Sequence, residues 1–467
     1  MNLFTDPWIP LATPAGPRYV TYVELLSGEA DAAELDHPEP WLAACARMLL
    51  AALTQVVLPC RDDAELAAAC ARPLPRALVE NRVAPYVAGA ALLGPGPRFL
   101  QPHGADAEDD PLATTRLFFD RAATYGQTLR ARPVAALCAG CAAVALYGFL
   151  AHAPQGGRGY SPSARGSSPL TTLVVASSVR SSAHANTLPL DHARAHYPVD
   201  PSVPWHLVDR VAKPGEAIGL AEGLFWAPRH VRVTEAPKGP CPFCGRDGAR
   251  VRACAFGPGA KVAGGYYPHP WTPWRDLKGE RRAQVVPARP AWTMLARWVR
   301  PTDEGGPAPA VASYARATGA TRVTLLAAGA RFDQTKWLGT LAATYDTPLD
   351  PSALDATERR AEAVDGARAA LLGAIRAATR GQGRAIDEAE ARFWQAATEA
   401  AERADDVAFA RHVRGAALTI YTDTLSVDVA HPSRGPLVAR AKVGLLAGLT
   451  KALTGARAPT TETHAAS

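Results

Sequence analysis

The chain has 467 residues, a hydrophobic content of 48% and a formal net charge of +6. This length suits two or three domains with a large core, and the ordinary hydrophobic content excludes an intrinsically disordered protein. The small basic excess is compatible with a nucleic-acid partner but does not establish one. The first ten residues lack the basic start and apolar run of a signal peptide, so we expect a cytoplasmic protein with reduced thiols.

The first part of the chain mixes β-like and helical patterns. Residues 2–26 combine short β-like runs with Pro and Gly turns. Helical spacing predicts a helix over residues 39–58, and acidic residues open a second one over residues 62–71. The uncharged run 134–151 has the length of a membrane span, but it is poor in Leu, Ile and Phe. A buried helix is therefore the better prediction for it.

Two Cys-x-x-Cys pairs stand out, Cys138 with Cys141 and Cys241 with Cys244. The second pair, in CPFCG, has a proline between the cysteines and a glycine after them, which is typical of a zinc-knuckle turn. The first pair alone fits small buried helical residues equally well. Together the pairs supply four thiolates, the set that a tetrahedral structural Zn²⁺ requires. Because about a hundred residues separate the pairs, we predict that the metal joins two segments of one domain.

A glycine cluster, QGGRGY, follows the uncharged run at residues 155–160. Glycines permit close approach of the backbone to a ligand, and successive N–H groups can bind an anion. A flexible surface loop is the alternative. The pattern matches neither the P-loop nor the dinucleotide-binding fingerprint, so we predict no nucleotide site.

Two later segments are candidates for nucleic-acid contact. Lys261 stands between glycine-bearing turns in a basic, aromatic stretch, where it could contact a phosphate or a base edge; an ordinary solvated lysine is the alternative. Residues 171–178 are predicted to form a strand. Residues 323–343 are predicted to form a strand, a turn and a helix, with Asp333 and Gln334 at the tip of the turn.

The chain changes character after residues 347–351, TPLDP. Four helical stretches follow, at 353–379, 384–404, 405–425 and 435–454. Their apolar spacing suits bundle packing, and the small polar tail from Gly455 is expected to be disordered. We therefore predict an α+β protein. A large mixed α/β domain with an embedded zinc site covers residues 1–350, and a C-terminal four-helix bundle with its tail covers 351–467.

Seven short motifs occur in one order along the chain: NLFTDPWIPL, LCAGCAAVAL, ARGSSPLTT, IGLAEGLFWAP, CPFCG, YPHPW and PAWTMLARWV. In this order they resemble the large subunit (CasA type) of the type I-E CRISPR Cascade complex, nearly from end to end. The resemblance implies a non-catalytic subunit of an RNA-guided antiviral complex. Such a subunit reads the protospacer-adjacent motif (PAM) of double-stranded DNA from the minor groove, promotes duplex opening and R-loop formation, and recruits the helicase-nuclease. The implied partners are the guide-RNA-bearing Cascade subunits, the 5′ handle of the CRISPR RNA, target DNA and the helicase-nuclease, with no membrane.

The resemblance also assigns roles to individual residues. The implied residues are the zinc ligands Cys138, Cys141, Cys241 and Cys244, the PAM-reading glycines Gly156, Gly157 and Gly159, the minor-groove lysine Lys261 and the duplex-splitting glutamine Gln334. Two positions depart from the family pattern. Arg158 replaces a glycine of the loop, and Asp333 stands where an asparagine is common, so a carboxylate would face phosphate there. Both residues belong to the DNA-binding set that the resemblance implies.

The cysteine set is also compatible with two alternative functions. A zinc-dependent hydrolase or nuclease usually keeps an open metal position and rarely uses four thiolates. The sequence has no HExxH motif, and its histidines are scattered. A zinc-stabilised scaffold with inert loops is the third reading. We therefore expect no catalytic residues.

Overall fold

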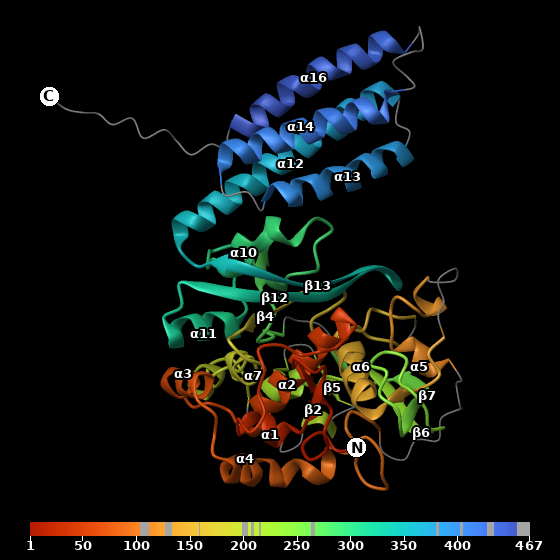
Figure 1. Ribbon diagram of the computed structural model, residues 1–467, viewed down its shortest axis with the longest axis vertical. Coiled ribbons are helices and arrows are strands. Elements are labelled where there is room, and N and C mark those ends of the chain that lie inside the picture. Colours follow the sequence, from red (N-terminus) through yellow and green to blue (C-terminus); the bar gives the residue numbers. More distant parts are fainter. Residues whose placement is uncertain are drawn as a thin grey trace, which may run out of the picture. The chain divides into compact units, whose positions relative to one another are not determined.

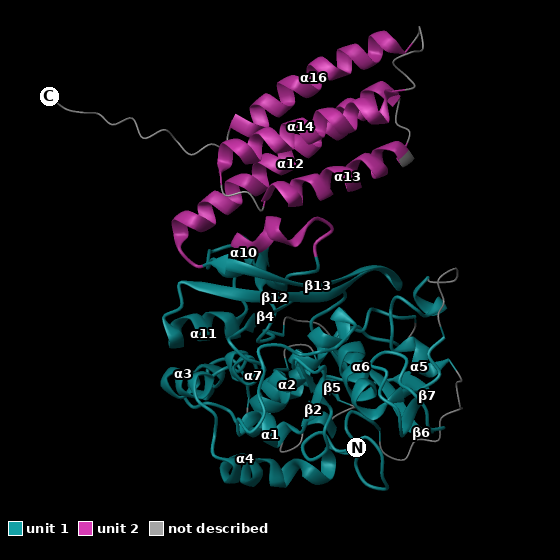
Figure 2. Cartoon of the chain, in the orientation of Figure 1, with its two compact units in different colours: residues 1–286, 297–348 teal, residues 287–296, 349–467 magenta. Residues whose placement is uncertain are grey.

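The computed structural model shows a mixed α/β chain that divides into two compact units (Figures 1 and 2). The described residues are 1–102, 112–126, 133–157, 159–198, 204–206, 210–213, 216–262, 267–379, 383–401, 405–426 and 434–454. The first unit comprises residues 1–286 and 297–348, and the second comprises 287–296 and 349–467. Two predictions, on Arg158 and on the tail from Gly455, lie outside the described residues.

Two buried helices form the centre of the first unit, α2 (Pro40–Val57) and α6 (Ala139–Ala151). They confirm the helix predicted over 39–58 and the buried helix predicted within 134–151. By length and hydropathy α2 could cross a membrane, but 72% of its 18 residues are buried inside the protein, as in the core helix of a folded domain. A Cβ at Gly148 would lie 2.3 Å from the Cys45 sulfur, so only glycine lets the two helices approach this closely.

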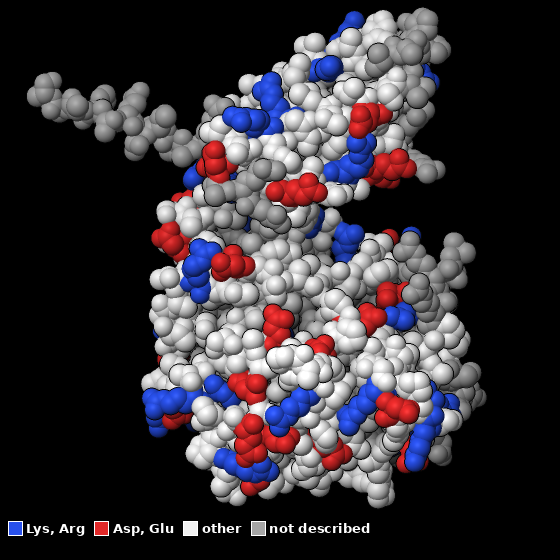
Figure 3. Space-filling model, viewed as in Figure 1, with Lys and Arg blue, Asp and Glu red and all other residues white. Residues whose placement is uncertain are grey.

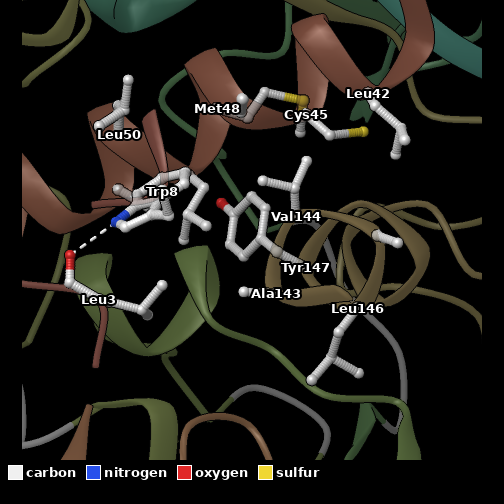
Figure 4. Close-up of a cluster of buried hydrophobic side chains, with 14 of the residues drawn as sticks. Leu3, Trp8, Leu42, Cys45, Met48, Leu50, Ala143, Val144, Leu146 and Tyr147 are labelled. Atoms are coloured by element: carbon white, nitrogen blue, oxygen red, sulfur yellow. Dashed lines mark hydrogen bonds between the residues drawn. The ribbon is translucent and has the colours of Figure 1, made fainter. Parts of the chain in front are cut away.

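The core around these helices is aromatic and aliphatic (Figure 4). Trp8 belongs to the same buried cluster as residues of both helices, although it is distant from them in the sequence, and its indole N–H donates to the Leu3 carbonyl at 2.7 Å. Tyr147 of α6 lies near Cys45 of α2 in the same view. The N-terminal segment is thus packed into the core rather than lying on its surface.

Shorter helices surround this core. They are α1 (Tyr22–Leu26), α3 (Asp63–Ala71), α4 (Arg76–Val83), α5 (Ala113–Arg116), α7 (Val179–Ala185), α8 (Leu190–Ala193), α9 (Leu220–Leu224) and α11 (Pro309–Thr318), with 3-10 turns at Ala84–Gly89, Ala123–Tyr125 and Pro204–His206. The predicted helix at 62–71 is confirmed as α3. Its start is fixed by Asp62, whose carboxylate accepts the Glu65 N–H at 2.9 Å.

The main sheet has the order β13-β12-β4 and is antiparallel throughout. Its strands are β4 (Thr171–Val175), β12 (Arg322–Asp333) and β13 (Lys336–Pro348). The strands predicted at 171–178 and from 323 are confirmed. The helix predicted after the turn is wrong, because this segment is β13. It pairs with β12 from Arg322↔Pro348 to Asp333↔Lys336, forming the long hairpin of Figure 1.

Four smaller sheets complete the first unit. Two have three strands: β3 (Leu137–Cys138), β7 (Arg250–Pro258) and β6 (Arg229–Ala236) in the order β3-β7-β6, and β10 (Glu280–Ala283), β9 (Trp274–Leu277) and β11 (Gly305–Gly306) in the order β10-β9-β11. The other two are the antiparallel pair β1 (Ile9–Leu11) and β2 (Arg18–Val20) and the parallel pair β5 (Val211–Ala212) and β8 (Lys261–Val262).

Four long helices make up most of the second unit: α12 (Pro351–Thr379), α13 (Gly383–Ala401), α14 (Asp406–Thr424) and α16 (Gly435–Thr454). Each of the four predicted helical stretches overlaps one of them almost completely, although α12 and α13 begin slightly earlier than predicted. Small residues bring α12 and α16 together, since a Cβ at Gly448 would lie 2.6 Å from the Ala370 Cβ. The segment 287–296 belongs to this unit; α10 (Leu295–Val299) and a 3-10 turn (Ala291–Met294) begin in it, and the Trp292 N–H donates to Thr398 Oγ1 at 3.2 Å.

Candidate metal centre and nucleic-acid interface

The two cysteine pairs meet in one cluster. The Sγ atoms of Cys138, Cys141, Cys241 and Cys244 all lie within 4.8 Å of one another, and those of Cys138 and Cys244 are 3.6 Å apart. A tetrahedral Zn²⁺ with bonds of about 2.3 Å places its sulfurs about 3.8 Å apart, so the donor set fits this ion. Within the described ranges, these four form the one group of three or more His, Cys, Asp or Glu side chains close enough to share a metal.

The first pair is held by the start of α6. Cys138 is the N-cap residue, and its sulfur accepts the Cys141 N–H at 3.4 Å. A helix N-terminus favours negative charge, so this position suits thiolates. Gly140, between them, is needed for packing: a Cβ there would lie 3.2 Å from the Trp8 Cβ.

The second pair forms a tight turn before β7. The Cys241 N–H donates to the Arg246 carbonyl at 2.9 Å, and the Gly245 N–H donates to the Cys241 carbonyl at 3.0 Å. Gly245 has φ +70°, a conformation that favours glycine. Pairing of β3 with β7 places Cys138 opposite Arg250, which brings the two distant pairs together.

Burial and crowding control the ionisation of these sulfurs. Hydrogen bonding with Cys138 and the other two sulfurs, together with burial, raises the pKa of Cys141. Four thiolates at this spacing repel one another, and a divalent cation removes that repulsion. Four thiolates would fill every position of a tetrahedral ion, so a metal bound here would have no open position.

The glycine cluster forms a compact turn. The Gly156 N–H donates to the Tyr160 carbonyl at 3.1 Å, and the Tyr160 N–H donates to the Gly157 carbonyl at 3.0 Å. Gly159 has φ +92°. A Cβ at Gly156 would lie 2.6 Å from the Tyr160 Cβ, whereas a Cβ at Gly157 would meet nothing within 4 Å.

Sequence reasoning missed the residue that holds this turn, Arg229. Its guanidinium is buried, lies 5.0 Å from the centre of the Tyr160 ring, and donates to the Pro154 carbonyl at 2.7 Å and to the Ser161 carbonyl. It thereby ties the two ends of the loop. Burial lowers the pKa of Arg229. No sequence signal marks it, because its partners are backbone carbonyls.

A second buried arginine positions the segment after the loop. Arg165 donates to the hydroxyls of Thr171 at 2.7 Å and Thr272 at 3.1 Å, and to the Ala151 carbonyl at 2.8 Å. Burial lowers the pKa of Arg165 to about 10. These bonds connect the end of α6 to the start of β4.

Lys261 lies on β8, and the backbone beside it bonds to the segment that carries Arg229. Its N–H donates to the Arg210 carbonyl at 2.8 Å, and the neighbouring Ala260 N–H donates to the Ala227 carbonyl at 2.8 Å. Its side chain is half-buried, and within the described residues it forms no ion pair. The segment 227–229 therefore anchors the backbone beside Lys261 and, through Arg229, the glycine loop.

Gln334 lies at the tip of the hairpin between β12 and β13. It is exposed and has φ +54°, a left-handed conformation that costs a non-glycine residue about 1–2 kcal/mol. Asp333 is exposed and lies opposite Lys336. Backbone strain of this kind is found preferentially at functional sites.

Two adjacent serines, Ser167 and Ser168, connect this hairpin to the glycine loop by hydrogen bonds. The Gln155 N–H donates to Ser167 Oγ at 3.3 Å, and the Phe332 N–H donates to Ser168 Oγ at 2.8 Å. Across the described chain, no hydrogen bond joins Lys261, Gln334 and the glycine loop directly. The connections are indirect. Segment 167–168 bonds to both the hairpin and the glycine loop, and segment 227–229 bonds to both the glycine loop and the backbone beside Lys261.

Charge on the first unit is mixed rather than gathered. Figure 3 shows Lys and Arg interspersed with Asp and Glu over the visible face. Charged side chains of this unit also form ion pairs, as between Arg121 and Glu39 at 3.0 Å and between Arg316 and Asp63 at 2.6 Å. A phosphate-binding surface of one sign is therefore not a feature of this face.

Comparison with known proteins gives consistent results. Residues 2–418 match the family described as CRISPR-associated protein Cse1. The fold is similar to that of Thermus thermophilus CasA (Cse1), with 19% identity, coverage of 97% of this chain and 99% of that one, and a TM-score of 0.73. It is also similar to Cse1 from Acidimicrobium ferrooxidans, with 17% identity, coverage of 97% and 98%, and a TM-score of 0.65. A chain of a CRISPR RNA-guided surveillance complex matches at 16% identity, with coverage of 96% and 99% and a TM-score of 0.67.

Proposed function

The chain belongs to the CRISPR-associated protein Cse1 family, and we propose on that basis that it is the non-catalytic large subunit of an RNA-guided Cascade surveillance complex of type I-E. The observation that carries the proposal is the family match over residues 2–418. The match of nearly the whole fold to a chain of such a complex supports it. The proposed partners are the guide-RNA-bearing subunits, the 5′ handle of the CRISPR RNA and the helicase-nuclease that the subunit recruits.

We propose that the glycine loop and Lys261 read the PAM of double-stranded DNA from the minor groove. Minor-groove readout is degenerate, so groove width and a few donors suffice. A loop with no side chain at Gly157 can bring its backbone close to the groove floor. Lys261 is supported by its place on the segment that also anchors this loop, and by its lack of an ion-pair partner among described residues.

Gln334 is the proposed wedge that separates the first base pair and starts the R-loop. Unstacking one step costs a few kcal/mol, which guide pairing and protein contacts then offset. Two observations support this role: the residue projects from the tip of a long hairpin, and its backbone is strained. Asp333 beside it would repel phosphate, so we place the amide rather than the carboxylate in contact with DNA.

The four-cysteine cluster is the proposed site of a structural Zn²⁺. Cys138, Cys141, Cys241 and Cys244 would hold the ion and bind together segments that are far apart in sequence. The donor set of four sulfurs favours zinc over harder cations such as Mg²⁺. In the second unit, the four long helices are proposed to act as a four-helix bundle, with the domain boundary near residue 350.

The test is a gel shift with DNA that carries randomised bases beside the target. The guide-loaded partner complex is used with and without this chain. Binding that requires the chain and selects a short motif is expected. A chain that adds no affinity, or that binds all sequences equally, would contradict the proposal. Lys261→Ala should weaken binding while guide-RNA incorporation stays normal, and Lys238→Ala, at an exposed lysine outside the proposed interface, serves as the control.

A further inference from the structure

Each sulfur of the cysteine cluster interacts with an N–H or O–H group, and these groups come from two parts of the chain. Cys138 accepts from the Cys141 N–H at 3.4 Å, and Cys241 interacts with the Cys244 N–H. The sulfur of the first cysteine in each pair therefore interacts with a backbone N–H of its own turn. The sulfur of the second cysteine interacts with a side chain from the N-terminal part of the chain.

The partner of the Cys141 sulfur is the imidazole ring of His37. The His37 Nε2 lies 3.4 Å from the Cys141 sulfur, and the Glu39 N–H donates to His37 Nδ1 at 3.1 Å. Because Nδ1 accepts a hydrogen bond, the ring proton resides on Nε2. His37 is thus oriented by the backbone to donate its N–H to a thiolate.

Tyr19 is the side-chain partner of Cys244, because its hydroxyl interacts with the Cys244 sulfur. The Arg246 guanidinium lies 4.6 Å from the centre of the Tyr19 ring and donates to the Pro7 carbonyl at 2.9 Å. On the other side, Tyr19 pairs with Pro10 between β2 and β1. The ring is therefore fixed both by the N-terminal hairpin and by the cysteine turn itself.

We propose that His37 and Tyr19 are positioning residues of the metal centre, so that the N-terminal segment 1–37 is part of the metal site. A zinc held by four thiolates carries a net charge of about −2 in a largely buried place, and donors to the sulfurs spread that charge. Both side chains line one small cavity with two of the cysteines, Cys138 and Cys141. This inference depends on the structural metal proposed above.

Metal affinity of the full-length protein tests the role directly. Zinc is titrated in competition with a chromophoric chelator for wild type, His37→Phe, His37→Gln and Tyr19→Phe. Loss of such an outer hydrogen bond typically weakens metal binding by about 10- to 100-fold, and this loss is expected for both phenylalanine variants. His37→Gln, which keeps an N–H donor, should recover part of it. The controls are His196→Phe at an exposed histidine and Tyr345→Phe on β13, which should bind as wild type does.

Cobalt substitution separates a positioning role from a purely structural one. The cobalt-loaded variants should keep the spectrum of four-sulfur tetrahedral coordination, with a shift of the thiolate-to-cobalt charge-transfer band. Wild-type affinity in both phenylalanine variants would overturn the inference. So would X-ray absorption showing three sulfurs and one nitrogen in wild type, because His37 would then be a ligand. A wild-type protein that binds no metal would overturn the metal proposal itself, and that result is seen before any variant is made.

Discussion

Replacing Gly156 by alanine tests whether the glycine loop is a fixed structure. The new Cβ would lie 2.6 Å from the Tyr160 Cβ and 3.2 Å from Arg229 Nη2. Neither neighbour is free to move: Tyr160 packs against the Arg229 guanidinium, and that guanidinium donates to the Pro154 carbonyl at 2.7 Å. The loop must therefore shift or break the contacts of Arg229.

The size of the effect follows from these contacts. Overpacking of this kind costs about 1–3 kcal/mol, and a lost hydrogen bond from a charged donor costs about 1.5–3 kcal/mol. We expect Gly156→Ala to destabilise the protein by about 1–3 kcal/mol, towards the upper end if Arg229 is displaced. Gly159→Ala tests strain alone, since φ is +92° and nothing lies nearby; it should cost about 1–2 kcal/mol.

Gly157→Ala is the matched control for stability and the test for function. No atom lies within 4 Å of its Cβ, so the change in stability should stay within about 0.5 kcal/mol. The added methyl group would nevertheless stand on the surface proposed to face the groove floor, so PAM-dependent binding should weaken.

Chemical denaturation of each variant and the randomised-base gel shift are the two assays. Wild-type stability in Gly156→Ala would refute the packing argument. Wild-type DNA affinity in Gly157→Ala would refute the close approach of this backbone to DNA.

Three further predictions concern other parts of the first unit. Gln334→Gly should stabilise the protein by up to about 1 kcal/mol, because the relief of left-handed strain exceeds the entropy that glycine adds to the unfolded chain, yet weaken target binding as Gln334→Ala does; unchanged binding in both variants would exclude the wedge role. Cys241→Ser should lose the metal found in wild type by elemental analysis, and acid should release it because protons compete for the thiolates; a serine variant that keeps its metal would show that this sulfur is not a ligand. Burial lowers the pKa of His184 to about 3, so the unfolded chain takes up the proton first. The stability that it contributes should be complete above about pH 6.5 and fall towards pH 3, by up to about 1.4 kcal/mol per unit; a His184→Phe variant with the same slope as wild type would contradict this.

The sequence was most informative where chemistry demands particular residue types. CPFCG predicted a cysteine turn, and the need for four ligands pointed to Cys138 and Cys141, which the structure places beside it. Helices α2 and α3 were predicted close to their observed limits, because apolar spacing and an N-cap are local signals.

The wrong helix shows where local signals fail. Within Lys336–Pro348, the run Leu341, Ala342 and Ala343 favours a helix, but the segment folds as β13 because β12 lies beside it along its whole length. Propensity is overruled by such pairing. Arg229 and His37 could not be predicted for a related reason. Their roles depend on neighbours that are distant in sequence, and such contacts leave no motif.

The separation of the two cysteine pairs sets an order of events during protein synthesis. At about 5–20 residues per second, the first pair is made roughly 5–20 s before the second. Throughout that interval Cys138 and Cys141 have only half of their ligand set, although Tyr19 and His37 have already been made. Capture of the proposed metal would therefore be a late step, which can be completed only after translation has passed Cys244. Until then, the nascent chain presents two thiols that depend on a reducing environment to stay usable.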